Sequence, residues 1–182
     1  MGEWNTVRLS EVVATNVNSY SSKDNWEYVN YLDTGNITEN VIADIQYIDL
    51  ATEKLPSRAK RKVKHNSIVY STVRPNQKHF GIIKSMPENF LVSTGFTVID
   101  VDPEKADADF IFFLLSREDI VDHLHAIAEQ SVSAYPSLRP SDIENLEIDL
   151  PDLDTQKKIA SILNAVSNKM GENVKINDNL AA

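Results

Sequence analysis

The order of apolar and polar residues predicts short strands in the first half of the chain and helices after them. Apolar runs bounded by glycine, proline, asparagine or aspartate are typical of strands. Such runs are Val7–Leu9, Trp26–Tyr31, Ile45–Leu50, Ser67–Val73, Phe80–Ile83 and Phe90–Val101. Gly95 interrupts the last run, so we expect a bulge or a bend at that position.

Beyond Asp102 the apolar residues change to helical spacing. The first predicted helix buries Phe110, Ile111, Phe113, Leu114 and Leu115, and the second buries Ile120, Val121, Leu124, Ile127 and Ala128. Ser116 with Asp119 predicts a capping box for the second helix, and Ser141 with Glu144 predicts another one. A final strand is predicted from the alternation of Leu146, Ile148 and Leu150.

The last predicted element is an amphipathic helix with Asp154 as its N-cap. Its seam positions recur at spacings of four and three, the a/d pattern of a coiled coil. They are Ile159, Leu163, Val166, Met170, Asn173, Asn177 and Leu180. Such a helix packs either on its own domain or on a partner helix. Asn173 and Asn177 favour a partner, because asparagine is tolerated in a seam where it sets register or partner choice.

Together these elements predict an α/β (α+β) chain with one globular domain. A length of 182 residues and a hydrophobic content of 42% suffice for one core. We expect a twisted, mostly antiparallel sheet with packed helices over residues 1–151. Residues 152–182 are expected to form a helix for dimerisation or spacing.

Charge is strongly segregated along the chain. The formal net charge is −9, which by itself argues against a polyanionic partner. The segment Lys54–Lys84, however, holds nine of the 18 basic residues and no acidic residue, so it carries +9 and the rest of the chain −18. A basic patch on an acidic body can still neutralise phosphates where it makes contact.

Two polar loops supply further candidate DNA contacts. The strand ending in Val73 leads into a loop with hydroxyl, amide and cationic side chains, and the segment Gln130–Pro140 is a second loop. Such groups contact phosphates and base edges. The predicted DNA-binding residues are Arg58, Lys60, Arg61, Lys62, Lys64, Thr72, Arg74, Asn76, Lys78, Ser133, Tyr135 and Arg139. The dense cationic run from Lys60 to Lys64 is assigned to phosphates and the loop residues to bases or their neighbours. The alternative is structural, with Arg74 in an ion pair and Tyr135 packed.

Catalytic and metal-binding patterns are lacking. The sequence has no cysteine, no glycine-rich phosphate loop and no G-x-S-x-G motif. The acid pairs Asp100/Asp102 and Asp149/Asp152 have no third carboxylate at suitable spacing. We therefore predict no catalytic residue and no metal site. No stretch approaches the ~20 apolar residues of a membrane span and no leader pattern is seen, so a cytoplasmic location is expected.

The order of motifs resembles a target recognition domain of the specificity subunit of type I restriction-modification systems. The resemblance runs from about Trp4 onward, and the combination of IVYSTVRP (68–75) with LPDLDTQKKIASIL (150–163) is its most specific part. PSRAKRKVK (56–64), VSTGF (92–96) and DFIFFLL (109–115) also match. Asn66 stands where such domains usually have a Gly-Asp turn, and we expect it to preserve that turn in a left-handed conformation. The chain also has one domain and one short helix, where the usual subunit has two domains and two long helices.

This resemblance implies a non-catalytic reader of one half of a bipartite target in double-stranded DNA. It implies docking to a modification (methyltransferase) subunit and a restriction (motor and nuclease) subunit, which would use S-adenosylmethionine, ATP and Mg²⁺. For a chain of this length it implies a homodimer through the terminal helix. Two other classes stay open: a stand-alone metal-dependent endonuclease, and a protein-interaction or antitoxin-like module.

Overall fold

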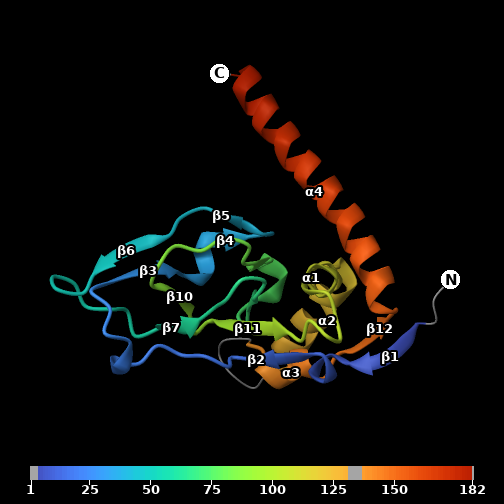
Figure 1. The fold of residues 1–182 in the computed structure, drawn as a ribbon, viewed down its shortest axis with the longest axis horizontal. Helices are drawn as coiled ribbons and strands as arrows, with labels where there is room; N and C mark the ends of the chain where they lie inside the picture. Colours follow the sequence, from blue (N-terminus) through green and yellow to red (C-terminus); the bar gives the residue numbers. More distant parts are fainter. Residues whose placement is uncertain (1–3, 131–136, 182) are drawn as a thin grey trace.

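Two four-stranded sheets, a helical end and one projecting helix make up the structure, a computed structural model that describes residues 4–130 and 137–181 (Figure 1). The strands are β1 (Asn5–Arg8), β2 (Val13–Thr15), β3 (Tyr28–Leu32), β4 (Ile37–Thr38), β5 (Val41–Ile42), β6 (Gln46–Asp49), β7 (Ala59–Lys62), β8 (Ile68–Ser71), β9 (Phe80–Ile82), β10 (Phe90–Ser93), β11 (Phe96–Val101) and β12 (Glu147–Leu150). The α-helices are α1 (Ala108–Leu115), α2 (Glu118–Glu129), α3 (Pro140–Glu144) and α4 (Leu153–Ala181). Short 3₁₀ turns are η1 (Leu9–Glu11), η2 (Ser22–Asp24), η3 (Thr34–Asn36) and η4 (Pro75–Gln77).

The pairing of the strands is mostly antiparallel, as predicted. One sheet has the order β6-β3-β10-β7, in which only β3 and β10 are parallel. The other has the order β2-β11-β8-β9 and is antiparallel throughout. β1 pairs with β12 and β4 with β5 as two-stranded ribbons. The mixed α/β architecture predicted from the sequence is therefore confirmed.

The predicted break at Gly95 separates the two sheets. The run Phe90–Val101 is two strands, β10 and β11, one in each sheet, joined by the Thr94-Gly95 turn. Apolar residues on both sides of this turn share one core cluster, which includes Phe90, Phe96 and Val69. Burial on both sides of the turn thus holds the sheets in a fixed arrangement.

A larger core lies under the helical end. Five of the eight residues of α1 are buried, and α2 contributes Val121, Leu124 and Ala128. They pack against the sheet residues Ile68 and Ile99 and against Ile148 of β12. The two apolar helices predicted from the sequence are therefore core helices.

Three predicted helix caps are wrong by one or two residues. Arg117, not Ser116, precedes α2, because Ser116 ends α1 and its hydroxyl donates to the Phe113 carbonyl (2.9 Å). Arg139, not Ser141, precedes α3, and its backbone N–H donates to Asp142 (2.7 Å).

At the start of α4 the cap is Asp152 in place of Asp154. Its carboxylate accepts the backbone N–H (2.9 Å) and the hydroxyl (2.8 Å) of Thr155. Side-chain spacing alone does not separate a cap from an acid in the first turn, because both contribute favourably near a helix N-terminus.

The strands missed by the sequence analysis are polar or very short. β7 has the sequence AKRK, in which only Ala59 is buried, so it lacks the apolar alternation that reveals a strand. Its ladder to β10 and its contacts with the segment 18–20 hold it in place. β2, β4 and β5 span two or three residues each.

Asn66 fulfils the expectation for the turn before β8. Its φ of 68° is left-handed, and the turn is closed by hydrogen bonds between Lys64 and Ser67 through backbone (3.0 Å) and side chain (2.9 Å). Asparagine tolerates this conformation better than most residues.

Helix α4 is anchored only at its start and then projects from the body (Figure 1). Gln156 and Ala160 are buried against the domain, whereas most residues beyond Leu163 are exposed. No helix in the described ranges is long and apolar enough to cross a membrane.

Candidate nucleic-acid interface

The basic run forms strand β7 at one edge of the first sheet. Lys60 is exposed, and its carbonyl accepts the backbone N–H of Tyr20 (2.8 Å). Arg61 forms a bridge with Ser19, and its Nε is buried without a hydrogen bond to the described residues. The backbone of β7 is therefore paired on both sides, so contact with a ligand is left to its side chains, of which Lys60 is exposed.

Two of the lysines are engaged within the protein. Lys62 forms an ion pair with Asp24 and lies 5.2 Å from the centroid of the Trp26 ring. The hydrogen bond from Lys62, followed by that from the Ser21 backbone, lowers the pKa of Asp24 below its ordinary value. Lys64 lies 3.8 Å from a carboxylate oxygen of Asp100. These two are weaker candidates for phosphate contacts than Lys60, because their charges are already partly compensated.

The first loop begins where β8 ends. Thr72 is fixed by its backbone N–H (2.8 Å) and its hydroxyl (3.0 Å), which both donate to the Gly95 carbonyl. Arg74 follows in a left-handed conformation with φ of 48° and is exposed, as is Asn76. A non-glycine residue in this conformation is uncommon and costs of order 1 kcal/mol or more. The first loop thus points Arg74 outward at an energetic cost.

Lys78 at the far side of this loop is held by two acids. Its ammonium lies 2.7 Å from Glu118 at the start of α2 and 3.3 Å from Glu39. The hydrogen bond to Glu118, and then that to Glu39, raises the pKa of Lys78 above its ordinary value. This lysine connects the loop to α2. Its assignment to base contact stays a prediction, and the alternative is that it stabilises the fold.

The structure brings the second loop against the first. The backbone N–H of Leu138 donates to the Thr72 carbonyl (2.8 Å), and Val73 forms a bridge with Ser137. Arg139 is exposed at the start of α3. Ser133 and Tyr135 lie outside the described residues, so their predicted contacts are untested.

Hydrogen bonds through the Thr94-Gly95 turn connect all three candidate segments. Thr94 donates its backbone N–H to the carbonyl of Arg58 (2.8 Å), which precedes β7. Gly95 accepts from Thr72, and Thr72 in turn accepts from Leu138 (2.8 Å). The sequence analysis missed the role of this turn, although the glycine inside an apolar run was a signal that pointed to it.

The terminal helix carries a row of exposed apolar side chains. The exposed fraction is 52% for Val166 and 64% for Met170, and Leu163 is exposed as well. Asn173 and Asn177 are exposed on the same face, whereas the side chain of Leu180 lies outside the described residues. Ile162, Val174 and Ile176, which the a/d assignment left out, are also exposed and widen this row. The predicted seam is thus free of contact with its own domain beyond its first turns.

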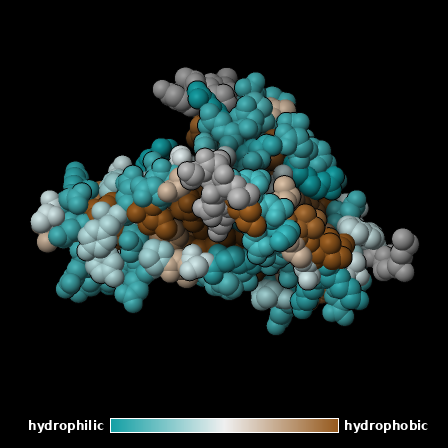
Figure 2. Space-filling model, turned by 90° about the horizontal axis from the view of Figure 1, so that it is seen from above, coloured by the Kyte–Doolittle hydropathy of each residue, from teal (hydrophilic) through white to brown (hydrophobic). Residues whose placement is uncertain are grey.

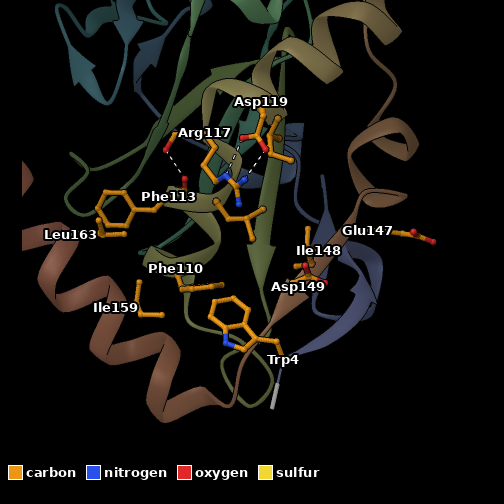
Figure 3. Close-up of a pocket in the computed structure, with 13 residues that line it drawn as sticks. Trp4, Phe110, Phe113, Arg117, Asp119, Glu147, Ile148, Asp149, Ile159 and Leu163 are labelled. Carbon is orange, nitrogen blue, oxygen red and sulfur yellow. Dashed lines mark hydrogen bonds and ion pairs between the residues drawn. The ribbon is translucent and has the colours of Figure 1, made fainter. Parts of the chain in front are cut away.

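An apolar groove lies at the base of this row (Figure 3). Its volume is about 680 Å³, and Trp4, Phe110, Phe113, Ile159 and Leu163 contribute apolar walls. The ion pair between Arg117 and Asp119 (2.7 Å) lines the opposite side. Seen from the side on which α4 projects, apolar surface gathers at the end that holds β1 (Figure 2). Because Ile159 and Leu163 belong to both, the groove and the helix row form one continuous apolar surface.

The acids considered for metal binding have structural partners. Asp100 accepts from the Ser67 hydroxyl (2.5 Å), Asp149 accepts from Thr6 (2.7 Å), and Asp152 caps α4. Among the residues that the structure describes, no group of three or more His, Asp or Glu side chains is placed to hold a metal ion.

Comparison with known proteins defines the class to which this fold and these loops belong. The family model described as type I restriction modification DNA specificity domain matches residues 1–181. The chain belongs to this family. The resemblance found in the sequence is thereby confirmed.

Two curated relatives are specificity subunits. The chain is 26% identical over 180 residues to the type I restriction enzyme HindI specificity subunit of Haemophilus influenzae. The matched region covers 99% of this chain and 39% of that protein. It is 23% identical over 177 residues to the putative type I restriction enzyme MjaX specificity subunit of Methanocaldococcus jannaschii, covering 93% and 40%. The chain therefore spans well under half the length of these relatives.

Solved structures agree. One similar chain comes from structural work on the complex assembly and conformational transition of the type I R-M system. It has a TM-score of 0.79 and 28% identity, and the match covers 96% of this chain and 44% of that chain. The HsdS subunit from Thermoanaerobacter tengcongensis has a TM-score of 0.78 and 26% identity, covering 95% and 44%. The S subunit from M. genitalium shares the fold, with a TM-score of 0.59 and 14% identity. The match covers 94% of this chain and 41% of that subunit.

Proposed function

We propose that this chain reads one half of a bipartite DNA target for a type I restriction-modification complex and performs no catalysis itself. The observation that carries the proposal is the hydrogen-bonded link between Arg58, the Thr94-Gly95 turn, Thr72 and Leu138. This link gathers a basic strand and two polar loops, three segments far apart in the sequence, into one potential DNA-facing surface. Rigid placement of several contacting groups is what sequence reading requires.

Within this surface we assign phosphates to Lys60, with Arg61 beside it, and base edges to Thr72, Arg74 and Asn76. Lys60 is exposed on the strand, which suits contact with a phosphate. Arg74 is exposed, and its guanidinium forms no hydrogen bond or ion pair with other described residues, so its donors are free within that part of the chain. Arginine that is bidentate to guanine is the commonest specific contact in the major groove.

The test is a comparison of two variants on two kinds of DNA. The full chain is titrated with its preferred duplex and with a scrambled duplex at several salt concentrations, alone and with a modification subunit. Arg74→Ala is expected to reduce the affinity ratio of the two duplexes by about tenfold. Lys60→Ala is expected to weaken binding to both alike. Equal behaviour of the two variants would contradict the assignment, and nicking of DNA by the pure chain with Mg²⁺ would favour an endonuclease.

We further propose that two copies associate through α4. The stripe from Leu163 to Met170 exposes apolar side chains over about two turns, and an exposed apolar row of this kind is typical of an interaction face. A symmetric pair would present two equivalent reading surfaces and so fit a target with two half-sites.

Docking of the modification and restriction subunits belongs to the same proposal. The relatives are named as specificity subunits of restriction enzymes, and such a role leaves catalysis to other chains. S-adenosylmethionine, ATP and Mg²⁺ are assigned to those partners, and we place the complex in the cytoplasm.

A further inference from the structure

Resting on the proposed function, we propose that Arg58 reads a base, preferably guanine, and that Asp33 is the positioning residue that orients it. The sequence analysis listed Arg58 among the predicted DNA-binding residues and did not single out Asp33. The geometry around Gly95 separates Arg58 from the lysines that follow it and joins it to the turn at Asp33.

Gly95 gives Arg58 its place. A Cβ added at Gly95 would lie 2.8 Å from the Thr34 methyl carbon and 3.7 Å from Nη2 of Arg58. The guanidinium therefore lies above the bare backbone of the turn, beside Thr34. That same turn accepts both hydrogen bonds from Thr72, so Arg58 stands next to the loop that carries Arg74.

Asp33 precedes Thr34 in this turn and is the carboxylate whose charge interacts with the guanidinium. Its carboxylate accepts hydrogen bonds from the Thr34 backbone N–H (2.9 Å) and the Tyr31 hydroxyl (3.0 Å). Burial raises the pKa of Asp33, but these hydrogen bonds and the charge of Arg58 outweigh it, so the pKa lies below its ordinary value. The carboxylate is ionised at neutral pH, and its position is set by the hydrogen bonds from Thr34 and Tyr31.

Arg58 keeps its donors for a ligand. It is exposed, and no hydrogen bond or ion pair within 4 Å joins its guanidinium to other residues in the described ranges. Lys62, Lys64 and Lys78 differ in this respect, since each pairs with a carboxylate. A planar guanidinium with free donors matches the two acceptors O6 and N7 of guanine. The charge of Asp33 acts on this guanidinium from beyond ion-pair distance.

The experiment uses the full chain and a duplex selected by it from a random pool. Affinity is measured for that duplex and for a set of duplexes in which each base pair is replaced in turn. The affinity of every duplex is measured at several salt concentrations. Arg58→Lys keeps the charge and is expected to lose about tenfold discrimination at one base pair while the salt slope is unchanged. Asp33→Asn, close in shape, is expected to weaken discrimination at that same base pair. Lys60→Ala serves as the control that weakens all duplexes alike.

Two results overturn the proposal. One is an Arg58→Lys variant with undiminished discrimination at every base pair. The other is an Arg58→Ala variant that weakens all duplexes in proportion, as a phosphate contact would. A wild-type chain without any preferred sequence contradicts the proposed function itself, and this outcome is seen before any variant is made. Thermal unfolding of each variant separates loss of reading from loss of fold, because Arg58 is exposed and its replacement is expected to leave the melting temperature unchanged.

Discussion

At the scale of residues, the basic side chains divide into paired and unpaired groups. Lys62 and Lys78 hold the fold together through carboxylates, whereas Lys60 and Arg74 have exposed charges. The sequence shows all of these as equivalent cations, because the acids that pair with them come from distant positions such as Asp24 and Glu118. The division of labour is therefore a property of the tertiary structure.

Lys60→Ala and Lys62→Ala should behave differently in DNA binding. The loss of one phosphate contact lowers the slope of log affinity against log salt by about 0.9, and we expect this change for Lys60→Ala. Lys62→Ala leaves Asp24 without its partner, so we expect a lower melting temperature and a smaller change in slope. Titrations at several salt concentrations with parallel thermal scans make the comparison. Identical slopes for the two variants would refute this division.

Asp33 makes a prediction about acid stability. Its folded pKa lies below the ordinary value of 3.8, so the unfolded chain takes up a proton first as pH falls. Its contribution to stability is thus complete above about pH 5 and is lost as pH falls through the folded pKa. Asp33→Asn should reduce the free energy of unfolding at neutral pH and flatten its decline in acid. Urea unfolding between pH 3 and 7 tests this, with the exposed Asp44→Asn as control; parallel curves for Asp33→Asn and the wild type would contradict it.

At the scale of elements, apolar periodicity predicted most of the long segments. The core helices α1 and α2 and the strands β8 and β12 appear where the sequence placed them, because each buries a regular set of side chains. β7 escaped prediction because partner strands, not its own residues, make it extended. The loops that form the candidate interface were recognised as polar, but their joining through Gly95 depends on contacts between residues far apart in sequence.

The junction between α4 and the domain depends on one buried amide. Gln156 is 1% exposed; its side chain accepts the backbone N–H of Asp107 (2.9 Å) and donates to the Pro151 carbonyl (2.8 Å). Removal of these bonds leaves buried backbone groups unpaired, at a cost of ~1–3 kcal/mol.

Gln156→Ala is therefore expected to lower the free energy of unfolding by about 2 kcal/mol and to speed hydrogen exchange in the first turns of α4. Denaturant unfolding and exchange measurements check this. The neighbouring Lys157→Ala, at an exposed position, is the control. Unchanged stability of Gln156→Ala would show that α4 is anchored elsewhere.

At the scale of the whole molecule, the proposed reading surface lies on the sheets and loops, and an apolar face lies on α4 and its groove. The helix has 29 residues, so it extends for roughly 43 Å, and most of its described residues beyond Leu163 are exposed. A second copy aligned with it would cover the apolar row. In the proposed arrangement, DNA reading and assembly use separate parts of the chain.

Association through α4 is tested by a matched pair of substitutions. Val166→Glu places a charge in the apolar row, and Asn168→Glu places one about 200° around the helix. In analytical ultracentrifugation we expect the wild type and Asn168→Glu to sediment as dimers. We expect Val166→Glu to sediment as a monomer. A wild type that remains monomeric at high concentration would contradict association through this helix.

The central claim is that each copy reads one half-site. The most direct test lets the full chain, together with a modification subunit, select duplexes from a random pool, and the bound duplexes are then sequenced. We predict one short motif that occurs twice in inverted orientation at a fixed spacing. A bound pool with no enriched motif, or no salt-dependent binding at all, would contradict the claim.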